Sequence, residues 1–170
     1  MGDSRVLIEP FRKSKHDRSH FDCGSAKLNH YIQNQVSLDH RRNLARCFAA
    51  VHEGYPETLA GYYTLSAYSL ERDSTTAADR GVPYSVIPAV LIGRLAVCQR
   101  FQGQGIARAL LVDAFRRILA IHENAGIRIV VVDPLGEGVI GLYKKFGFQQ
   151  LNNRQLILPV KTILAGTLKQ

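Results

Sequence analysis

The sequence lacks any long apolar run, and this absence excludes one large class of protein. No stretch approaches the roughly 18 continuous apolar residues that a membrane-spanning helix requires. The first residues, Met-Gly-Asp-Ser-Arg, also lack the apolar core of a signal peptide. We therefore expect a protein that stays in the cytoplasm and does not enter a membrane.

Cysteine is scarce as well, because the chain carries only Cys23, Cys47 and Cys98. An odd number of widely spaced cysteines is typical of free thiols in a reducing compartment rather than of a disulfide framework. Each lies beside apolar residues in an expected element, which favours small buried hydrophobes over a nucleophile. No Cys/His spacing predicts a zinc site, so we expect no metal.

Acidic residues are outnumbered: 22 Lys and Arg stand against 14 Asp and Glu, which leaves a net charge of +8 and an isoelectric point near 9.7. Such a surface favours an anionic partner, for example nucleic acid, an acidic protein or a phosphorylated cofactor. The 170 residues are enough for one domain with a substantial core, and we find no internal repeat. We expect a single domain over residues 1–170.

Hydrophobic periodicity predicts the order β-α-β-β-β-α-β-α-β. The expected strands are Val6–Phe11, Arg46–His52, Leu59–Leu70, Val86–Val97, Ile127–Val132 and Leu156–Leu164. The expected helices are an amphipathic one carrying Leu28, Tyr31, Ile32 and Val36 after capping residues Asp22–Ser25, a long one from Gln104 or Gly105 to about Ile121, and a short one over Val139–Phe146. The expected connections include a charged break at Asp39–Asn43, a turn-rich connector at Glu53–Thr58 and a polar loop at Glu71–Pro83. Hairpin-linked and helix-linked strands together predict an α/β fold, a mixed sheet with helices on both faces.

The most informative segment joins the fourth expected strand to the long helix. It carries Gly103 and Gly105, one residue apart, and glycine allows a positive φ and a close approach of backbone to ligand. The N–H groups of the helix's first turn, together with its dipole, form an anion site that suits phosphate. A P-loop is excluded because no Gly-Lys-Ser/Thr occurs. A dinucleotide fingerprint does not fit, because Ala109 and Leu110 follow and the loop lies late in the chain. A glycine turn without any ligand is the simpler alternative.

The pattern Arg100-x-x-Gly103-x-Gly105 resembles the pyrophosphate-binding signature of the GCN5-related N-acetyltransferases. The resemblance implies the fold of that family, with acetyl-CoA as co-substrate. It also implies cofactor contacts from the strand backbone, the loop and the first helical turn: Leu95, Ala96, Val97, Arg100, Gln102, Gly103, Gln104, Gly105, Ile106, Ala107 and Arg108.

Segments outside the loop resemble one subgroup of that family, the acetyltransferase toxins of bacterial type II toxin–antitoxin modules. These segments are Phe21–Gly24, Gly61–Leu65, Ile87–Pro88, Gly93–Val97 and Leu142–Phe148. The resemblance implies acetylation of the α-amino group of aminoacyl-tRNA, which blocks translation. It further implies a ribbon-helix-helix antitoxin as partner and a homodimer.

By the same resemblance, Tyr143 lies near the thioester sulfur and acts as general acid; a core tyrosine is the alternative reading. A phenol is almost wholly protonated at neutral pH and can donate a proton. No acidic residue has an obvious general-base role, and an α-amine, with a pKa of about 7.7–8.0, needs less base assistance than a lysine. The segment Asp133–Val139 departs from the family pattern, so we assign it no contact with acetyl-CoA.

Two basic clusters are candidates for contacting RNA phosphates. The first supplies Arg12, Lys13 and Lys15, and the second supplies Arg41, Arg42 and Arg46; a solvated charged surface explains either equally well. The role of Arg94, substrate contact or structure, stays open. Two further functions also remain open: an acetyltransferase acting on a small amine or a protein N-terminus, and an inactive fold that binds CoA or a protein partner.

Overall fold

The computed structural model describes residues 5–72 and 81–167, and the chain forms two compact units. The first unit comprises residues 1–65 and 94–114, and the second comprises residues 66–93 and 115–170. Strands β3 (Tyr55–Glu71) and β4 (Val86–Val97) each contribute residues to both units. The expectation of one domain over the whole chain stays a prediction.

The first unit contains β1 (Val6–Pro10), β2 (Arg46–His52), the first part of β3 and the end of β4. β1 runs antiparallel to β2, and β2 runs antiparallel to β3, so that Cys47 lies opposite Thr64. At the end of β4 the N–H of Cys98 donates to the carbonyl of Ala60, 2.8 Å away. The strand order is β1-β2-β3-β4-β5-β7-β6.

Three consecutive helical segments follow the N-terminal strand of this unit: α1 (Ala26–His30), the π-helical segment η1 (Tyr31–Gln35) and α2 (Val36–Arg41). Ser25 caps α1, as predicted, by accepting a hydrogen bond from the N–H of Leu28. The predicted charged break at Asp39–Asn43 is wrong over its first three residues, which belong to α2. Val36 is buried and keeps the apolar face inward, while basic residues suit the C-terminal end of a helix dipole. The chain leaves the helix at Asn43, whose φ is +58°.

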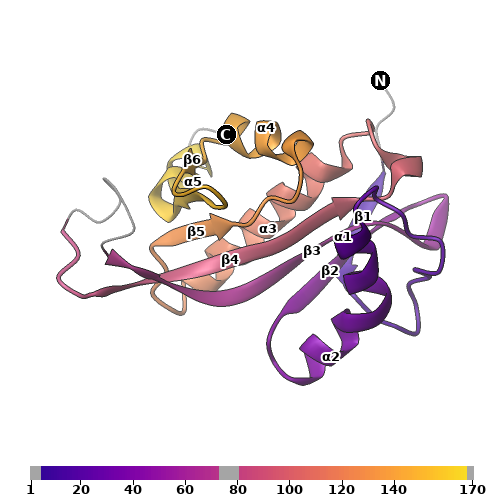
Figure 1. Cartoon of the computed structure of the whole chain (residues 1–170), viewed down its shortest axis with the longest axis horizontal. Helices are drawn as coiled ribbons and strands as arrows, with labels where there is room; N and C mark the ends of the chain where they lie inside the picture. Colours follow the sequence, from indigo (N-terminus) through magenta and orange to yellow (C-terminus); the bar gives the residue numbers. More distant parts are fainter. Residues whose placement is uncertain (1–4, 73–80, 168–170) are drawn as a thin grey trace. The chain divides into compact units, whose positions relative to one another are not determined.

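Helices cover both faces of the sheet in the first unit, which Tyr62 and Tyr63 make clear. The Tyr62 hydroxyl donates to the Leu28 carbonyl in α1, at 2.7 Å. The Tyr63 hydroxyl donates to Asp113 in α3 (Ile106–His122), also at 2.7 Å. Neighbouring residues of a strand point to opposite faces, so α1 and α3 lie on opposite faces here, as predicted; Figure 1 shows α1 and α2 beside β2 and β3.

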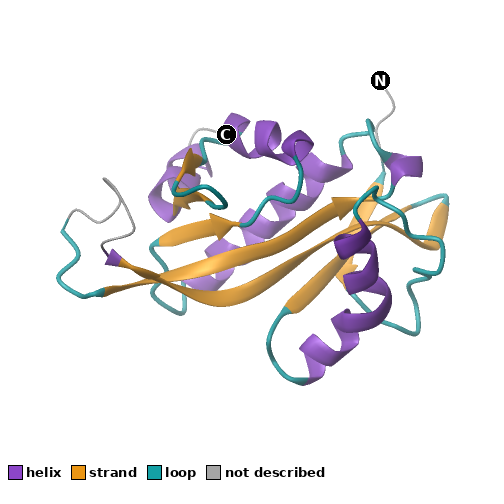
Figure 2. Ribbon diagram, viewed as in Figure 1, coloured by secondary structure: helices purple, strands orange, loops and turns teal. Residues whose placement is uncertain are grey.

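The second unit shows the mixed pairing that was predicted. β4 runs parallel to β5 (Ile129–Val132), and β5 runs antiparallel to β7 (Leu156–Pro159), which pairs with the short β6 (Gln149–Gln150). Two complete helices belong to this unit, α4 (Glu137–Lys145) and α5 (Val160–Thr167), together with residues 115–122 of α3 (Figure 2). Its core consists of apolar strand residues and their neighbours: Leu70, Val82, Ile87, Ala89, Ile129, Val131 and Ile157.

The predicted last strand, Leu156–Leu164, is wrong beyond Pro159, because the chain turns into α5 at Val160. Val160 and Ile163 are both buried, and their spacing of three residues is that of a helix face. A short apolar run does not distinguish strand from helix by composition alone.

Other boundaries also differ from the prediction. β3 begins at Tyr55, inside the expected connector, β5 begins at Ile129 rather than Ile127, and α4 spans Glu137–Lys145 rather than Val139–Phe146. The strand β6 was not predicted. Most of the expected polar loop Glu71–Pro83 lies outside the described residues.

Candidate active site

The junction between β4 and α3 is an open loop built on two glycines. After a short 3-10 turn over Gln99–Phe101, Gly103 and Gly105 take φ values of +77° and +80°. A Cβ added to either glycine would meet no atom within 4 Å. Glycine is therefore required by the backbone conformation rather than by crowding. The space in front of both residues is free to receive a ligand.

The helix after this loop offers the groups that bind an anion. The N–H of Ala109 donates to the carbonyl of Gly105 at 3.0 Å, so the residues between them form the first turn of α3. N–H groups of a first turn have no carbonyl four residues earlier in the helix, and the dipole of a 17-residue helix adds positive potential. Ile106 is buried and anchors the turn, whereas Gln104 and Arg108 are exposed and Ala107 is partly exposed. Gln102 to Arg108 thus fit a pyrophosphate.

The loop is held in place by hydrogen bonds from residues far away in the sequence. The side-chain amide of Gln102 donates to the Val97 carbonyl at 2.9 Å and to the Cys23 carbonyl at 3.4 Å. The N–H of Gln99 donates to the Asp22 carbonyl at 2.8 Å. The segment Phe21–Gly24 therefore supports the loop. Sequence reasoning noticed that segment only as a family resemblance and missed this role.

Arg100, expected to contact the cofactor, lies on aromatic rings beside the loop. Its guanidinium carbon is 4.9 Å from the centre of the Tyr55 ring and 5.3 Å from that of Phe101. Phe101 is buried and Arg100 is exposed. Stacking on rings orients a guanidinium while leaving its N–H edge available to an anion.

The last residues of β4 are the expected support for the pantetheine arm. Pairing between β4 and β5 covers Ala89–Ile92 only, although β4 continues to Val97. Because Cys98 bonds to β3 and strand residues alternate, the backbone groups of Leu95 and Val97 face away from β3. The Val97 carbonyl already accepts from Gln102. The side chains of Leu95, Ala96 and Val97 are buried, so only their backbone is available to a ligand.

Tyr143 lies on α4 in the second unit and is 2% exposed. Its ring packs edge-on against Phe148, with 5.3 Å between the ring centres. Burial raises the pKa of Tyr143 above that of a free phenol, so the hydroxyl is protonated at neutral pH. This is the protonation state that a proton donor needs.

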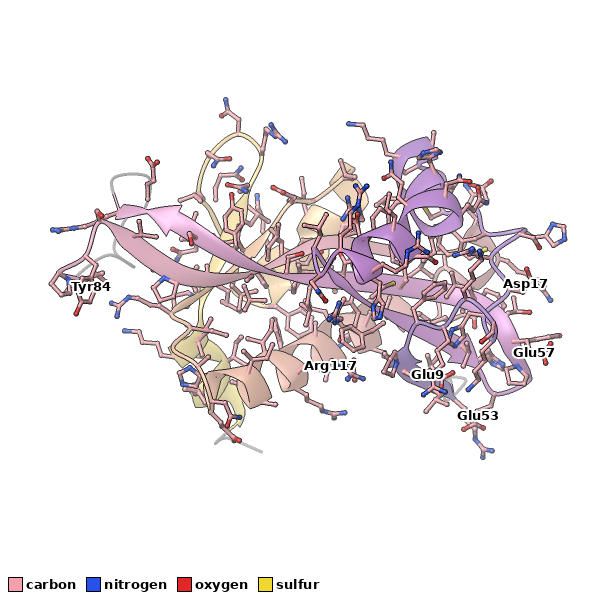
Figure 3. All side chains as sticks on the ribbon, turned by 90° about the horizontal axis from the view of Figure 1, so that it is seen from below. Glu9, Asp17, Glu53, Glu57, Tyr84 and Arg117 are labelled. Atoms are coloured by element: carbon pink, nitrogen blue, oxygen red, sulfur yellow. The ribbon has the colours of Figure 1, made fainter. Side chains whose placement is uncertain are left out.

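The first basic cluster has a mixed charge. Lys15 contacts the Glu9 carboxylate at 2.6 Å, and the buried His16 donates from Nε2 to the same oxygen at 2.8 Å while its Nδ1 accepts from the Arg12 N–H. Figure 3 shows four labelled carboxylates gathered at this end of the first unit: Glu9, Asp17, Glu53 and Glu57. Lys15 is therefore neutralised locally, while Arg12 and Lys13 are exposed.

The second cluster lies at the end of α2. Arg46 donates to the His40 carbonyl at 3.2 Å and to the Asn43 side chain at 2.9 Å, and so it closes the turn after the helix. Arg41 and Arg42 are exposed. Of the three residues expected to contact RNA here, Arg46 has a structural role that its sequence position did not reveal.

The described residues, 5–72 and 81–167, contain no group of three or more His, Cys, Asp or Glu side chains that could hold a metal ion. Within the same ranges, no helix is both long and apolar enough to cross a membrane. Cys23, Cys47 and Cys98 are free thiols, and burial raises the pKa of Cys23 and Cys47.

A mixed sheet with helices on both faces and a glycine loop leading into a helix N-terminus fit the architecture that the sequence resemblance predicts for an acetyl-CoA-dependent acetyltransferase. Residues 43–150 match the family described as "Acetyltransferase (GNAT) domain". The chain belongs to this family, and the predicted fold class and enzyme class are confirmed.

Among known proteins, the chain is 29% identical to a protein named "Probable toxin TacT" from Sinorhizobium fredii (strain NBRC 101917 / NGR234), with 95% of each chain covered. A structure entitled "AtaT complexed with acetyl-methionyl-tRNAfMet" is 28% identical, with a TM-score of 0.85, and the match covers 95% of this chain and 99% of that one. A structure of a tyrosine-to-phenylalanine mutant of AtaT, bound to the C-terminus of the antitoxin AtaR and acetyl-CoA, has 28% identity and a TM-score of 0.80 over 96% of this chain and 98% of that one. The predicted similarity to toxin acetyltransferases is confirmed.

Proposed function

We propose that this protein transfers the acetyl group of acetyl-CoA to the α-amino group of aminoacyl-tRNA and thereby inhibits translation, as the toxin of a toxin–antitoxin module. The observation that carries the acetyl-CoA half is the open loop at Gly103 and Gly105, tied to Val97 and Cys23 by Gln102. The acceptor half is supported by the tRNA complex of AtaT and by the net charge of +8.

Different segments of the chain bind different parts of acetyl-CoA in this reaction. The loop at Gly103–Gly105 and the first turn of α3, up to Arg108, hold the pyrophosphate, with Arg100 beside them. The backbone N–H groups of Leu95 and Val97 hold the pantetheine arm, and one of them stabilises the oxyanion. Acetyl-CoA supplies an activated acetyl thioester.

Tyr143 is the proposed general acid. The amine nitrogen forms a bond to the acetyl carbon, the carbon–sulfur bond breaks, and the Tyr143 hydroxyl gives its proton to the departing sulfur. The attacking amine loses its own proton to water. A tyrosine-to-phenylalanine mutant of AtaT was used for a complex with antitoxin and acetyl-CoA, which supports a tyrosine as the residue to test.

The same proposal extends to partners and location. A ribbon-helix-helix antitoxin neutralises the protein, which acts as a homodimer in the cytoplasm. The complex of AtaT with the C-terminus of AtaR supports an antitoxin partner. Size-exclusion chromatography with light scattering, of the protein alone and with its antitoxin, measures both assemblies.

The decisive experiment incubates the protein with labelled acetyl-CoA and a total pool of charged tRNA. We expect label on the aminoacyl group, released together with the amino acid by mild base, and none on the same pool deacylated beforehand. Label found on proteins or polyamines, and not on charged tRNA, would replace this acceptor with a small amine or a protein N-terminus. Acetyl-CoA binding without any transfer would leave only a binding function.

A further inference from the structure

Arg94 has an environment that the reaction described above does not use. It is a partly exposed residue of β4, and its guanidinium carbon lies 3.6 Å from the centre of the Tyr31 ring. The ion pairs among the described residues do not include Arg94. A guanidinium stacked on an aromatic face is held in one orientation and keeps its full positive charge.

The groups around this cation include polar atoms that have no partner. The Tyr31 hydroxyl and the Thr64 hydroxyl are buried and make no hydrogen bond with any described residue. Thr64 lies opposite Cys47 in the β2–β3 pairing, and Arg94 lowers the pKa of Cys47 against the larger effect of burial, so the cluster is contiguous. Buried polar groups without partners cost free energy and often mark a place where a ligand binds. Tyr31 also begins a π-helical segment, a distortion that is frequent at functional sites.

The position of the cluster along β4 relates it to the acceptor. The candidate anion site lies after the C-terminal end of this strand, at Gly103 to Arg108. In the proposed function, the arm that leaves the pyrophosphate runs back along Val97 to Leu95. Arg94 is the next residue in that direction. It therefore lies at the thioester end, where the acceptor amine must approach.

We propose that Arg94, stacked on Tyr31, is a positioning residue that selects the acceptor by charge: it admits an uncharged α-amine and disfavours acceptors that carry a second cation in the aminoacyl side chain. This inference rests on the proposed function and adds the class of aminoacyl group. A fixed positive charge disfavours the ammonium form of a nearby amine, which lowers the amine's pKa. The chain thereby gains the neutral nucleophile without an acidic general base.

The titratable groups on which Arg94 acts come from three elements: Tyr31 from η1, Cys47 from β2 and Tyr62 from β3. A fourth element, α2, supplies Asp39, which acts on Tyr31. Burial raises the pKa of Tyr31, Cys47 and Tyr62, so these three are neutral at the pH of the reaction. Asp39 is the one acidic group among them, and both its charge and a side-chain interaction with the Tyr31 hydroxyl raise the pKa of Tyr31. None of the ion pairs among the described residues joins Asp39 to Arg94.

The first test needs no mutation. One tRNA is charged with lysine and, separately, with Nε-acetyllysine, which keeps the side-chain stem and removes its charge. We expect kcat/KM to be about tenfold higher or more for the Nε-acetyllysyl form, as for like charges brought close together. Equal values of kcat/KM for the two forms overturn the inference. Acetylation of neither form, while another charged tRNA is modified, overturns it as well. Failure to acetylate any charged tRNA instead overturns the proposed function.

The second test compares Arg94→Gln and Arg94→Lys with Arg116→Gln, a matched loss of one charge at an exposed position of α3. We expect Arg94→Gln to bring the ratio of the two acceptors toward one, and Arg94→Lys and Arg116→Gln to preserve it. The pH profile of kcat, which reports the bound amine, should move to higher pH by about half a unit to one unit in Arg94→Gln only, while the profile of kcat/KM keeps the pKa of the free amine. An unchanged ratio and unchanged kcat profile in a folded Arg94→Gln protein overturn the assignment.

Discussion

Two of the described helices begin directly after a glycine with positive φ, and they differ in length and in composition. α3 follows Gly105, whose φ is +80°, and runs for 17 residues with Ile106, Leu110, Leu111 and Ala114 buried. α4 follows Gly136, whose φ is +97°, runs for nine residues and contains two more glycines. No side chain caps α4.

The comparison of α3 with α4 shows two ways in which a helix contributes to a site: through its backbone groups or through one side chain. The start of α3 offers backbone to a ligand, and its loop is fixed by bonds from Gln102 to Val97 and Cys23. α4 has weak intrinsic helix propensity because glycine costs about 1 kcal/mol per position. It is held by burial of Tyr143 against Phe148, so it serves to place one side chain.

The largest effect is expected at the side chain that α4 places. Tyr143→Phe removes one hydroxyl and should lower kcat by about 100-fold or more, because proton donation contributes on the order of 10²–10⁴. Tyr84→Phe, at an exposed tyrosine of the same unit, is the control. Single-turnover acetylation of charged tRNA measures both. Growth arrest that persists in cells expressing Tyr143→Phe would remove this residue from the mechanism.

The next effect compares the glycine loop before α3 with the glycine before α4. Gly103→Ala and Gly136→Ala both force a side chain into a positive φ, at a similar cost of about 1–2 kcal/mol. Only the first should weaken acetyl-CoA binding, by about tenfold, since its Cβ enters the space in front of the anion site. Calorimetric titration with acetyl-CoA and thermal unfolding measure the two properties. An equal loss of acetyl-CoA affinity in both variants would contradict the assignment of acetyl-CoA binding to the loop before α3 alone.

The two basic clusters should respond differently to salt. Arg41→Gln with Arg42→Gln is expected to weaken tRNA binding several-fold and to reduce the slope of log K against log salt by about one to two. Lys15→Gln should change the slope less, because Lys15 already contacts Glu9. Filter binding of tRNA between low and moderate salt gives the slopes. A larger change of slope for Lys15→Gln than for the double arginine variant would assign tRNA binding to the first basic cluster instead of the second.

A smaller effect is expected from the tether of the loop. Gln102→Ala removes the bonds to Val97 and Cys23 and should raise KM for acetyl-CoA a few-fold, with a stability loss of about 1 kcal/mol. Gln104→Ala, at an exposed residue of the same loop, is the comparison. A larger increase of KM for Gln104→Ala would show that direct contact matters more than the tether.

The smallest effect concerns pH and belongs to Glu9 in β1 of the first unit. Hydrogen bonds from Lys15 and His16 lower the pKa of Glu9, so this carboxylate stabilises the fold above its unfolded pKa near 4.5, and the contribution is lost as pH falls through the lower folded pKa. Glu9→Gln should therefore lower Tm at pH 7 by about 2–4 °C, for about 1 kcal/mol, with the difference vanishing in acid. A Tm difference between the parent protein and Glu9→Gln that grows as the pH falls would contradict a lowered pKa of Glu9.

Local signals in the sequence were enough to find the loop and most elements of the fold. The apolar run Val86–Val97 and the glycines at 103 and 105 depend on neighbouring residues only, and both agree with the structure. Element ends were less predictable. Val160–Thr167 is helical because Val160 and Ile163 are buried on one face, which depends on what packs against them.

By itself, the sequence determined a mixed α/β fold and an anion-binding loop, because hydrophobic period and glycine position act over a few residues. Only the tertiary structure decided which distant residues support that loop. Gln102 reaches Cys23 across 79 positions of sequence, and Arg94 meets Tyr31 across the sheet face, two contacts that no local pattern encodes. Long-range contacts form only when the whole core closes, since the entropy of joining distant segments is offset by burial of the apolar surface between them.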